Sequence, residues 1–246
     1  MSRCACSRPD FDAKTSNVTT TILAAGRPLT LLAEKAAFLA GSRTLLVADA
    51  HIGKAVSFRA LGVPVPRGTT SETLQALSAL IRTWRARRVV FLGDFLHSAR
   101  SHAAATLGAV ARWRREHAAL ELVLVRGNHD DRAGDPPAYL GMRVVDEPLE
   151  LDGFALCHHP RPRRGAYVLA GHLHPCISLG GRGFDHLRLP CFWLGDDVGV
   201  LPAFGAFTGM HPIRAGVGER VFAVADGAVT AMRGPAVAEA GDRRAA

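Results

Sequence analysis

Five short clusters of histidine, aspartate and asparagine recur along this chain of 246 residues. The clusters are Asp49-Ala50-His51, Gly93-Asp94-Phe95-Leu96-His97, Gly127-Asn128-His129-Asp130, Cys157-His158-His159 and Gly171-His172-Leu173-His174. Imidazole, carboxylate and amide groups bind divalent cations, and histidine also transfers protons near neutral pH. One cluster alone is weak evidence, because an aspartate can cap a turn and a histidine can hydrogen-bond to backbone inside a core. Five in succession indicate a shared metal site.

Each cluster directly follows a short apolar run, and these runs are the elements that must position it. The runs at 44–48, 89–92 and 122–125 are typical of strands buried on both faces. Loops at the carboxyl ends of strands in an open α/β sheet lie along one edge. We therefore expect the five clusters to converge there.

Helices are expected between the early strands, and more strands after them. Apolar residues at helical spacing predict a helix over 70–84, with Thr70 or Ser71 placed to cap it. A second helix is expected over 103–117. After Asn128 the chain becomes rich in strands, with candidates at 144–145, 154–157, 167–170, 187–193 and 221–224. The pattern predicts two packed sheets with helices outside.

Composition limits the class of protein. With 48% hydrophobic residues the chain can form one good-sized core, so we interpret 18–233 as a single domain between disordered tails at 1–17 and 234–246. Five cysteines, an odd number without a repeated spacing, argue for a reducing compartment. No signal peptide or membrane-spanning run is evident, so a cytoplasmic location is expected. The net charge of +8 favours an anionic partner, although ordinary surface arginine explains it equally well.

The ordered set of clusters resembles the calcineurin-like metallophosphoesterase superfamily over roughly residues 43–176. Within it, the chain is similar to the bacterial ligase-associated DNA damage response endonucleases of the PdeM type. That closer likeness rests on His51-Ile52-Gly53-Lys54, Cys157-His158-His159-Pro160 and the segment 201–209. The resemblance implies a four-layer α/β/β/α sandwich of two mixed sheets flanked by helices.

The resemblance also implies a ligand set for two divalent cations. It assigns Asp49, His51 and His174 to one cation and Asn128, His158 and His172 to the other, with Asp94 bridging. One carboxylate can span two cations roughly 3.5–4 Å apart, and such a pair activates water. A mixed His/Asp/Asn set without cysteine suits Mn²⁺ or Fe²⁺ better than a structural zinc site. Manganese is our first expectation, with iron and zinc as alternatives.

Two further histidines are candidates for catalysis. His129 resembles the family's catalytic histidine, which protonates the leaving alkoxide or contacts the phosphate, and His97 is expected beside it. A structural role is the alternative for both. Phosphoprotein phosphatases have aspartate followed by arginine at the first position and His-Glu at the second. His97-Ser98 and His129-Asp130 resemble the SbcD-type nucleases more closely.

Basic residues near the clusters are candidates for substrate contacts: Lys54, Arg161, Arg163 and Arg164. Lysine and arginine contact phosphates without sequence preference, and a solvated basic loop is the alternative. The function that the resemblance implies is a metal-dependent DNA endonuclease in DNA repair, associated with a DNA ligase and a helicase. The alternatives are an enzyme acting on nucleotides, phosphometabolites or phosphoproteins, and a metal-free assembly scaffold.

Overall fold

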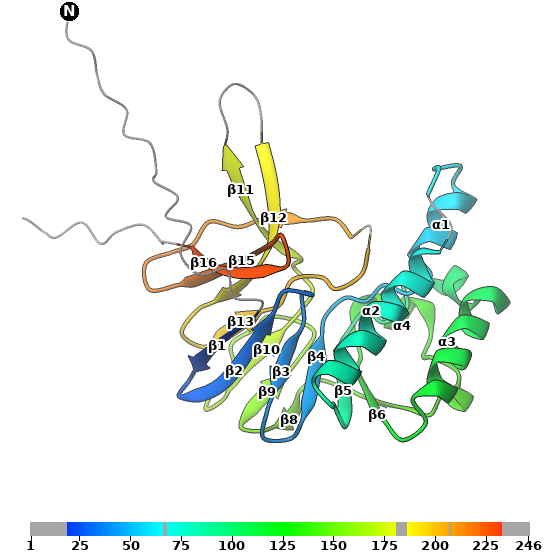
Figure 1. Ribbon diagram of the computed structural model, residues 1–246, viewed down its shortest axis with the longest axis horizontal. Coiled ribbons are helices and arrows are strands. Elements are labelled where there is room, and N and C mark those ends of the chain that lie inside the picture. Colours follow the sequence, from blue (N-terminus) through cyan, green and yellow to red (C-terminus); the bar gives the residue numbers. More distant parts are fainter. Residues whose placement is uncertain (1–18, 66–67, 181–185, 207, 233–246) are drawn as a thin grey trace, which may run out of the picture.

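The computed structural model describes residues 19–65, 68–180, 186–206 and 208–232. Two mixed β-sheets pack against each other, and helices lie outside the first sheet (Figure 1). The predicted α/β architecture of two packed mixed sheets is confirmed. Of the four layers expected, the helical layer outside the second sheet does not occur among the described residues, because their α-helices lie outside the first sheet. The α-helices of the described residues all fall between the fourth and seventh strands. The tails expected at 1–17 and 234–246 lie outside the described residues.

The first sheet has the order β1-β2-β3-β4-β5-β6-β7. Its strands are β1 (Thr19–Ala24), β2 (Arg27–Leu32), β3 (Ala37–Leu39), β4 (Thr44–Val47), β5 (Arg88–Leu92), β6 (Glu121–Val125) and β7 (Met142–Val145). Strands β1 to β4 are antiparallel, and β4 to β7 are parallel. The parallel strands therefore present their carboxyl ends along one edge.

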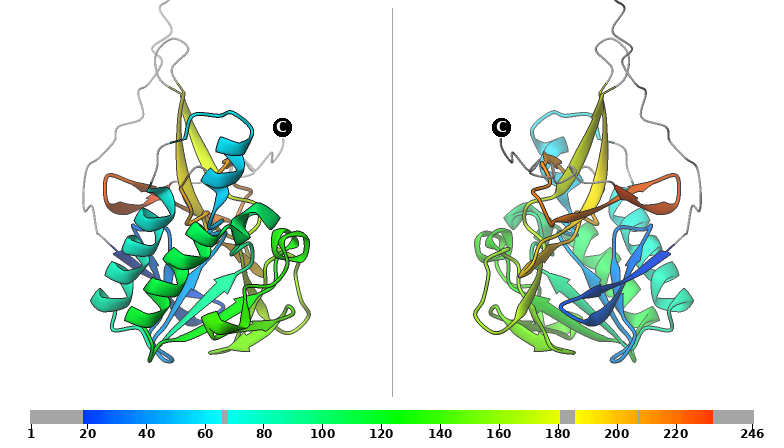
Figure 2. Two further views of the ribbon diagram at one scale, coloured as in Figure 1. Left: turned by 90° about the vertical axis from the view of Figure 1, so that its right-hand side faces the viewer. Right: turned by 90° about the vertical axis from the view of Figure 1, so that its left-hand side faces the viewer.

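The second sheet has the order β14-β11-β12-β13-β10-β9-β8, with β15 on β12 and β16 on β15. Its strands are β8 (Leu149–Leu151), β9 (Phe154–Leu156), β10 (Tyr167–Ala170), β11 (Pro175–Gly180), β12 (His186–Leu194), β13 (Val198–Val200), β14 (His211–Pro212), β15 (Arg220–Ala225) and β16 (Ala228–Met232). Strands β9, β10 and β13 run parallel. The β11–β12 hairpin projects beyond the packed sheets (Figures 1 and 2).

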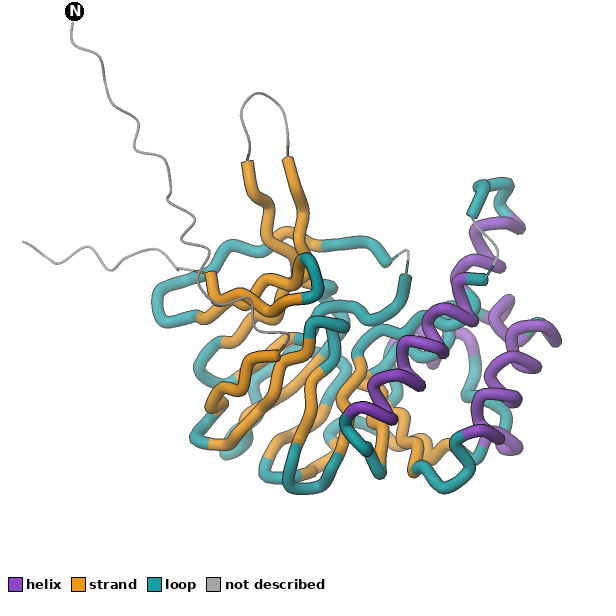
Figure 3. Tube along the Cα trace, viewed as in Figure 1, coloured by secondary structure: helices purple, strands orange, loops and turns teal. Residues whose placement is uncertain are grey.

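The α-helices among the described residues have between 6 and 15 residues. They are α1 (Lys54–Ala60), α2 (Thr69–Thr83), α3 (Ala104–Glu116) and α4 (Asn128–Ala133), with 3₁₀ turns η1 (Ala99–His102) and η2 (Ala138–Leu140). Figure 3 shows them gathered on one side of the molecule. The helices predicted over 70–84 and 103–117 are confirmed as α2 and α3. No helix among the described residues is long and apolar enough to cross a membrane.

The predicted cap of α2 is wrong. The helix begins one residue earlier than expected, at Thr69, and no side chain caps it. Thr70 and Ser71 consequently lie inside the first turn, where their hydroxyls are not in the N-cap position. Gly68 occupies the N-cap position, and its backbone is left-handed, with φ 100°.

Two apolar layers explain why the strands of the first sheet have continuous apolar sequences. Leu45 and Val47 of β4 pack with Leu77 of α2 and Trp113 of α3, whereas Leu46 faces the second sheet. Both faces of the strand are therefore removed from water, and each fully buried leucine or valine stabilises the fold by about 1.5–3 kcal/mol. This core holds the carboxyl ends of the strands in fixed positions.

Candidate metal centre

The loops after five parallel strands bring all seven predicted ligand residues together. Asp49 and His51 follow β4, Asp94 follows β5, Asn128 follows β6, His158 follows β9, and His172 and His174 follow β10. Among the described residues, ligand-type atoms that lie within 4.8 Å of one another form four overlapping sets: Asp49, His51 and His174; Asp49, Asp94 and His158; His158, His159 and His172; and His51, His97 and His129. The predicted assignment divides the seven ligands into two groups. The centre therefore lies where the edges of both sheets meet.

The first group consists of Asp49, His51 and His174. The Nε2 atoms of His51 and His174 are 3.3 Å apart, and His174 Nε2 is 3.5 Å from Asp49 Oδ1. Two ligand atoms each about 2.1 Å from one cation lie roughly 3.0 Å apart at right angles and roughly 3.4 Å apart in a tetrahedron. The observed separations have the spacing of atoms that share a cation.

The second group surrounds His158 Nε2. This atom lies 2.9 Å from Asn128 Oδ1 and 3.0 Å from His172 Nδ1. Asp94 reaches both groups, because its Oδ1 is 3.5 Å from His158 Nε2 and its Oδ2 is 3.8 Å from His51 Nε2. One carboxylate oxygen thus faces each group, which is an arrangement that suits a bridging ligand.

The carboxylate of Asp49 provides an independent test of whether a cation fits. Its Oδ2 accepts the backbone N–H of His172 at 2.9 Å, whereas its Oδ1 is buried and has no hydrogen-bond partner. A buried carboxylate oxygen without a partner is costly. A divalent cation bound to the first group would satisfy it, so the residues present fit a metal.

Backbone carbonyls fix the ring nitrogens of two of these histidines. His158 Nδ1 donates to Leu92 O at 3.0 Å, and His174 Nδ1 donates to Gly209 O at 2.9 Å. With Nδ1 as the donor, the neutral form of each ring presents the lone pair of Nε2 to the centre. For His51, burial and the nearby Lys54 charge lower the pKa, which favours the neutral form that binds metals.

The backbone is left-handed at five of the seven predicted ligands. Their φ angles are 51° for Asp49, 44° for His51, 52° for Asp94, 73° for His172 and 51° for His174. Such a conformation costs on the order of 1–3 kcal/mol for a residue with a side chain, and it clusters at functional sites. The sharp turns direct consecutive side chains toward the centre.

Glycine precedes two of the turns because ligand side chains occupy the space of a Cβ atom. A Cβ on Gly93 would lie 2.1 Å from His158 Nδ1, and one on Gly171 would lie 2.5 Å from Asp49 Oδ2. Both contacts are far inside van der Waals distance. A larger residue at either position would displace a ligand.

His129 and His97 lie beside the first group. His129 Nδ1 donates to the backbone carbonyl of His97 at 2.7 Å, and its Nε2 is 4.0 Å from Asp94 Oδ2. The two rings stack, with centroids 5.0 Å apart. Burial and the charges of Lys54 and His129 lower the pKa of His97 to about 4, so its ring is neutral at neutral pH.

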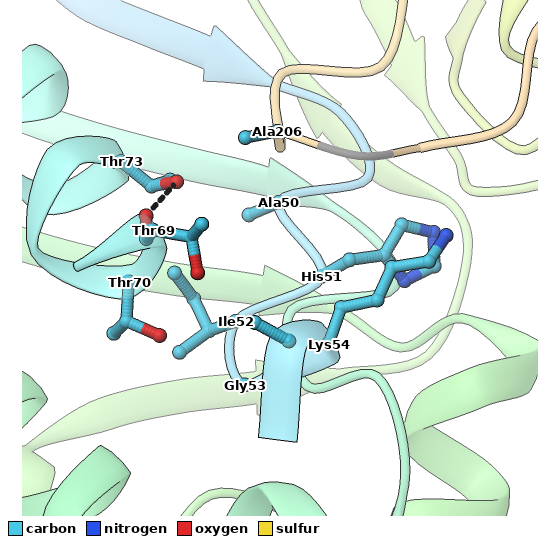
Figure 4. A pocket seen from close by; sticks show the side chains of 10 residues that line it. Ala50, His51, Ile52, Gly53, Lys54, Thr69, Thr70, Thr73 and Ala206 are labelled. Carbon is cyan, nitrogen blue, oxygen red and sulfur yellow. Dashed lines mark hydrogen bonds between the residues drawn. The ribbon is translucent and has the colours of Figure 1, made fainter. Parts of the chain in front are cut away.

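Lys54 also lies at the centre. Its Nζ is 5.8 Å from the Phe58 ring centroid, and burial lowers its pKa despite the opposing charges of Asp49 and Asp94. Figure 4 shows the Lys54 and His51 side chains lying close together beside a small pocket.

The three predicted arginines lie farther out. Arg161, Arg163 and Arg164 are exposed in the loop after His159. An Nη atom of Arg163 lies 3.9 Å from a carboxylate oxygen of Glu147. Among the described residues, no hydrogen bond or ion pair joins the Arg161 or Arg164 side chain to a predicted ligand.

Glu147 and Asp130 support the centre, and sequence reasoning assigned neither a role. Glu147 accepts the backbone N–H of His158 at 2.8 Å and of His159 at 2.9 Å. Asp130 accepts those of Leu96 at 3.1 Å and Gly127 at 3.0 Å, and so ties the loops after β5 and β6 together. Asp130 belongs to a cluster that the sequence singled out, whereas no local signal marked Glu147.

Solved structures of known proteins resemble this chain. The crystal structure of Pseudomonas putida nuclease MPE is 45% identical over 87% of this chain and 100% of that chain, with a TM-score of 0.78. This chain belongs to the same metallophosphoesterase family. The family resemblance expected from the sequence is therefore confirmed, and the protein is a phosphoesterase with buried histidine and aspartate groups that suit metal ions.

More distant solved structures include the phosphoesterase YfcE of E. coli, which is 15% identical over 74% of this chain and 88% of that chain, with a TM-score of 0.36. No protein-family model matches the chain. No curated protein sequence matches it either.

Proposed function

We propose that this metallophosphoesterase is a DNA endonuclease that acts in DNA repair and hydrolyses phosphodiester bonds at a dinuclear metal centre. The observation that carries the proposal is the position of Asp94, which has one carboxylate oxygen toward each of two ligand groups. The 45% identity to a nuclease supports a nucleic-acid substrate. Association with a DNA ligase and a helicase rests on the sequence resemblance.

Each ligand group would hold one divalent cation. Asp49, His51 and His174 would bind the first, Asn128, His158 and His172 the second, and Asp94 both. Imidazole, carboxylate and amide ligands without thiolate favour Mn²⁺, with Fe²⁺ and Zn²⁺ as alternatives. When bound, the two cations would supply Lewis acidity toward a phosphoryl group and would activate water.

The neighbouring side chains would orient the substrate and move a proton. His129 is held by its Nδ1–H bond to His97 O, so Nε2 faces the centre and can protonate the leaving oxygen. His97 stacks on His129 and limits its rotation. Lys54 provides a positive charge for a phosphate oxygen.

The arginine loop would contact the rest of the nucleic-acid strand. All three arginines are exposed, but Arg163 also forms an ion pair with Glu147. We therefore expect Arg161 and Arg164 to contribute more to binding than Arg163. Contacts of this kind add affinity without sequence preference.

The test is hydrolysis by purified protein with Mn²⁺. Closed circular single-stranded DNA, a chromogenic phosphodiester and a chromogenic phosphomonoester are compared. Cleavage of the circle supports the endonuclease, because a circle has no end for an exonuclease. Activity on the monoester with an intact circle would instead support an enzyme acting on nucleotides, phosphometabolites or phosphoproteins.

A further inference from the structure

A second pocket opens beside the first ligand group. Its volume is about 180 Å³, and its lining includes Lys35, His174, Thr208 and Met210. A water molecule takes roughly 30 Å³ and drug-sized ligands use roughly 300–1,000 Å³. The pocket therefore has room for a small group such as a phosphate with part of its sugar. Because His174 lines the pocket, a group bound there lies next to the metal centre.

Lys35 provides the charge of this pocket. It lies in the turn between β2 and β3, where the backbone is left-handed, with φ 64°. Its Nζ donates to Phe204 O at 3.0 Å, and burial lowers its pKa. An ammonium group has three N–H donors, so two remain after this bond. Among the described residues no carboxylate forms an ion pair with Lys35.

The hydrogen bond to Phe204 places Lys35 relative to the centre. Phe204 N donates to Ala48 O at 2.8 Å, and Gly205 N donates to Asp49 O at 3.2 Å. The segment that holds the lysine is thus attached to the end of β4 that carries the first predicted ligand. Lys35 is therefore fixed at a set distance from the metal centre instead of moving freely on the surface.

We propose that the pocket between Lys35 and His174 binds a phosphate group that flanks the scissile phosphodiester. This site rests on the proposed function, since a flanking phosphate exists in oligonucleotides and is absent from simple phosphomonoesters. The partly buried ammonium lacks an acidic partner, and a phosphate oxygen supplies one. The pocket would thereby favour a polymeric substrate over a small one.

The experiment uses chromogenic esters of thymidine with Mn²⁺. The 5′- and 3′-(p-nitrophenyl phosphate) esters are compared, each with and without a phosphate on the other hydroxyl. In one isomer the added phosphate should raise kcat/KM by about 10- to 100-fold, the range for a hydrogen bond between charged groups. Lys35→Met should abolish that gain and leave the ester without the added phosphate unchanged, and Lys35→Arg should restore part of it.

Two controls separate this inference from the proposed function. Arg87→Met removes an exposed cation at the opposite ends of the strands and should change neither ester. Binding of thymidine 3′,5′-bisphosphate, measured by calorimetry with Mn²⁺, repeats the comparison without turnover. If no ester is hydrolysed but Lys35→Met weakens this binding about tenfold, the proposed function fails and the phosphate site stands. If binding and any phosphate preference survive Lys35→Met, the site is overturned.

Discussion

Replacing His129 with alanine separates proton donation from metal binding. The His129 ring donates through Nδ1 to a backbone carbonyl and keeps Nε2 4.0 Å from Asp94 Oδ2. It belongs to neither ligand group that we assign, and its side chain is 32% exposed. The backbone N–H of residue 129, which donates to Asp94 Oδ1 at 2.9 Å, remains in the variant. His129→Ala should therefore retain both cations.

The expected loss depends on the leaving group. General acid catalysis contributes roughly 10²- to 10⁴-fold, so a diester with an alkoxide leaving group should lose that much turnover. This factor corresponds to about 2.7–5.4 kcal/mol of transition-state stabilisation. A p-nitrophenolate leaving group needs little protonation, and its rate should fall by less than about tenfold.

The assay measures kcat for both diesters with Mn²⁺, together with metal content. His117→Ala is the matched control. His117 follows α3, and its imidazole hydrogen-bonds to Ser78 of α2, so its removal should alter neither rate. Loss of metal from His129→Ala would contradict the assignment. Equal slowing of the two diesters would instead identify His129 as a phosphate contact.

Three other changes test the remaining assignments. Asp94→Ala removes the carboxylate shared by both groups, so metal analysis should find fewer than two ions per chain, and two retained ions would refute bridging. Neutralising the three arginines in 161–164 should weaken DNA binding and leave chromogenic diester hydrolysis nearly unchanged. The slope of log K against log salt concentration should become shallower by roughly 0.7–0.9 for each lost phosphate contact. If this variant binds DNA normally at several salt concentrations, the loop is solvated surface and does not contact the substrate. Gly171→Ala should displace Asp49, lower the metal content and destabilise the fold by about 1–3 kcal/mol. Gly209→Ala is the control, because its Cβ position has open space, and it should change neither the metal content nor the stability.

The strands that carry the clusters could be predicted because burial on both faces leaves a continuous apolar sequence. The prediction at 122–125 differs from β6 by one residue, and 167–170 coincides with β10. The N-terminal hairpin of β1 and β2 was not predicted. Residues 19–24 contain three threonines and only partial burial, so their sequence lacks that continuous apolar signal. Helix α1 was missed as well, since seven residues are too few to establish helical spacing.

The contacts of Lys35 and Glu147 could not be predicted, because they form only when separate parts of the chain pack together. Lys35 meets Phe204 across 169 residues, and that pairing depends on how the two sheets pack. Glu147 lies 11 residues before His158, yet only the return of the chain through β8 and β9 brings its carboxylate under the His158 backbone. Local patterns identify ligand types, whereas these contacts arise from the tertiary arrangement.

The strain at the predicted ligands links the fold to the chemistry. Five left-handed residues at roughly 1–3 kcal/mol each cost about as much as the whole stability of a typical domain, roughly 5–15 kcal/mol. The apolar layer between the sheets must offset this cost, and Leu46, Val90 and Leu92 lie in it directly before the strained turns. Because the strands are fixed by that layer, the turns cannot relax by moving the strand ends. The same burial that gives the strands their apolar sequence therefore holds the ligands in positions they would not adopt alone.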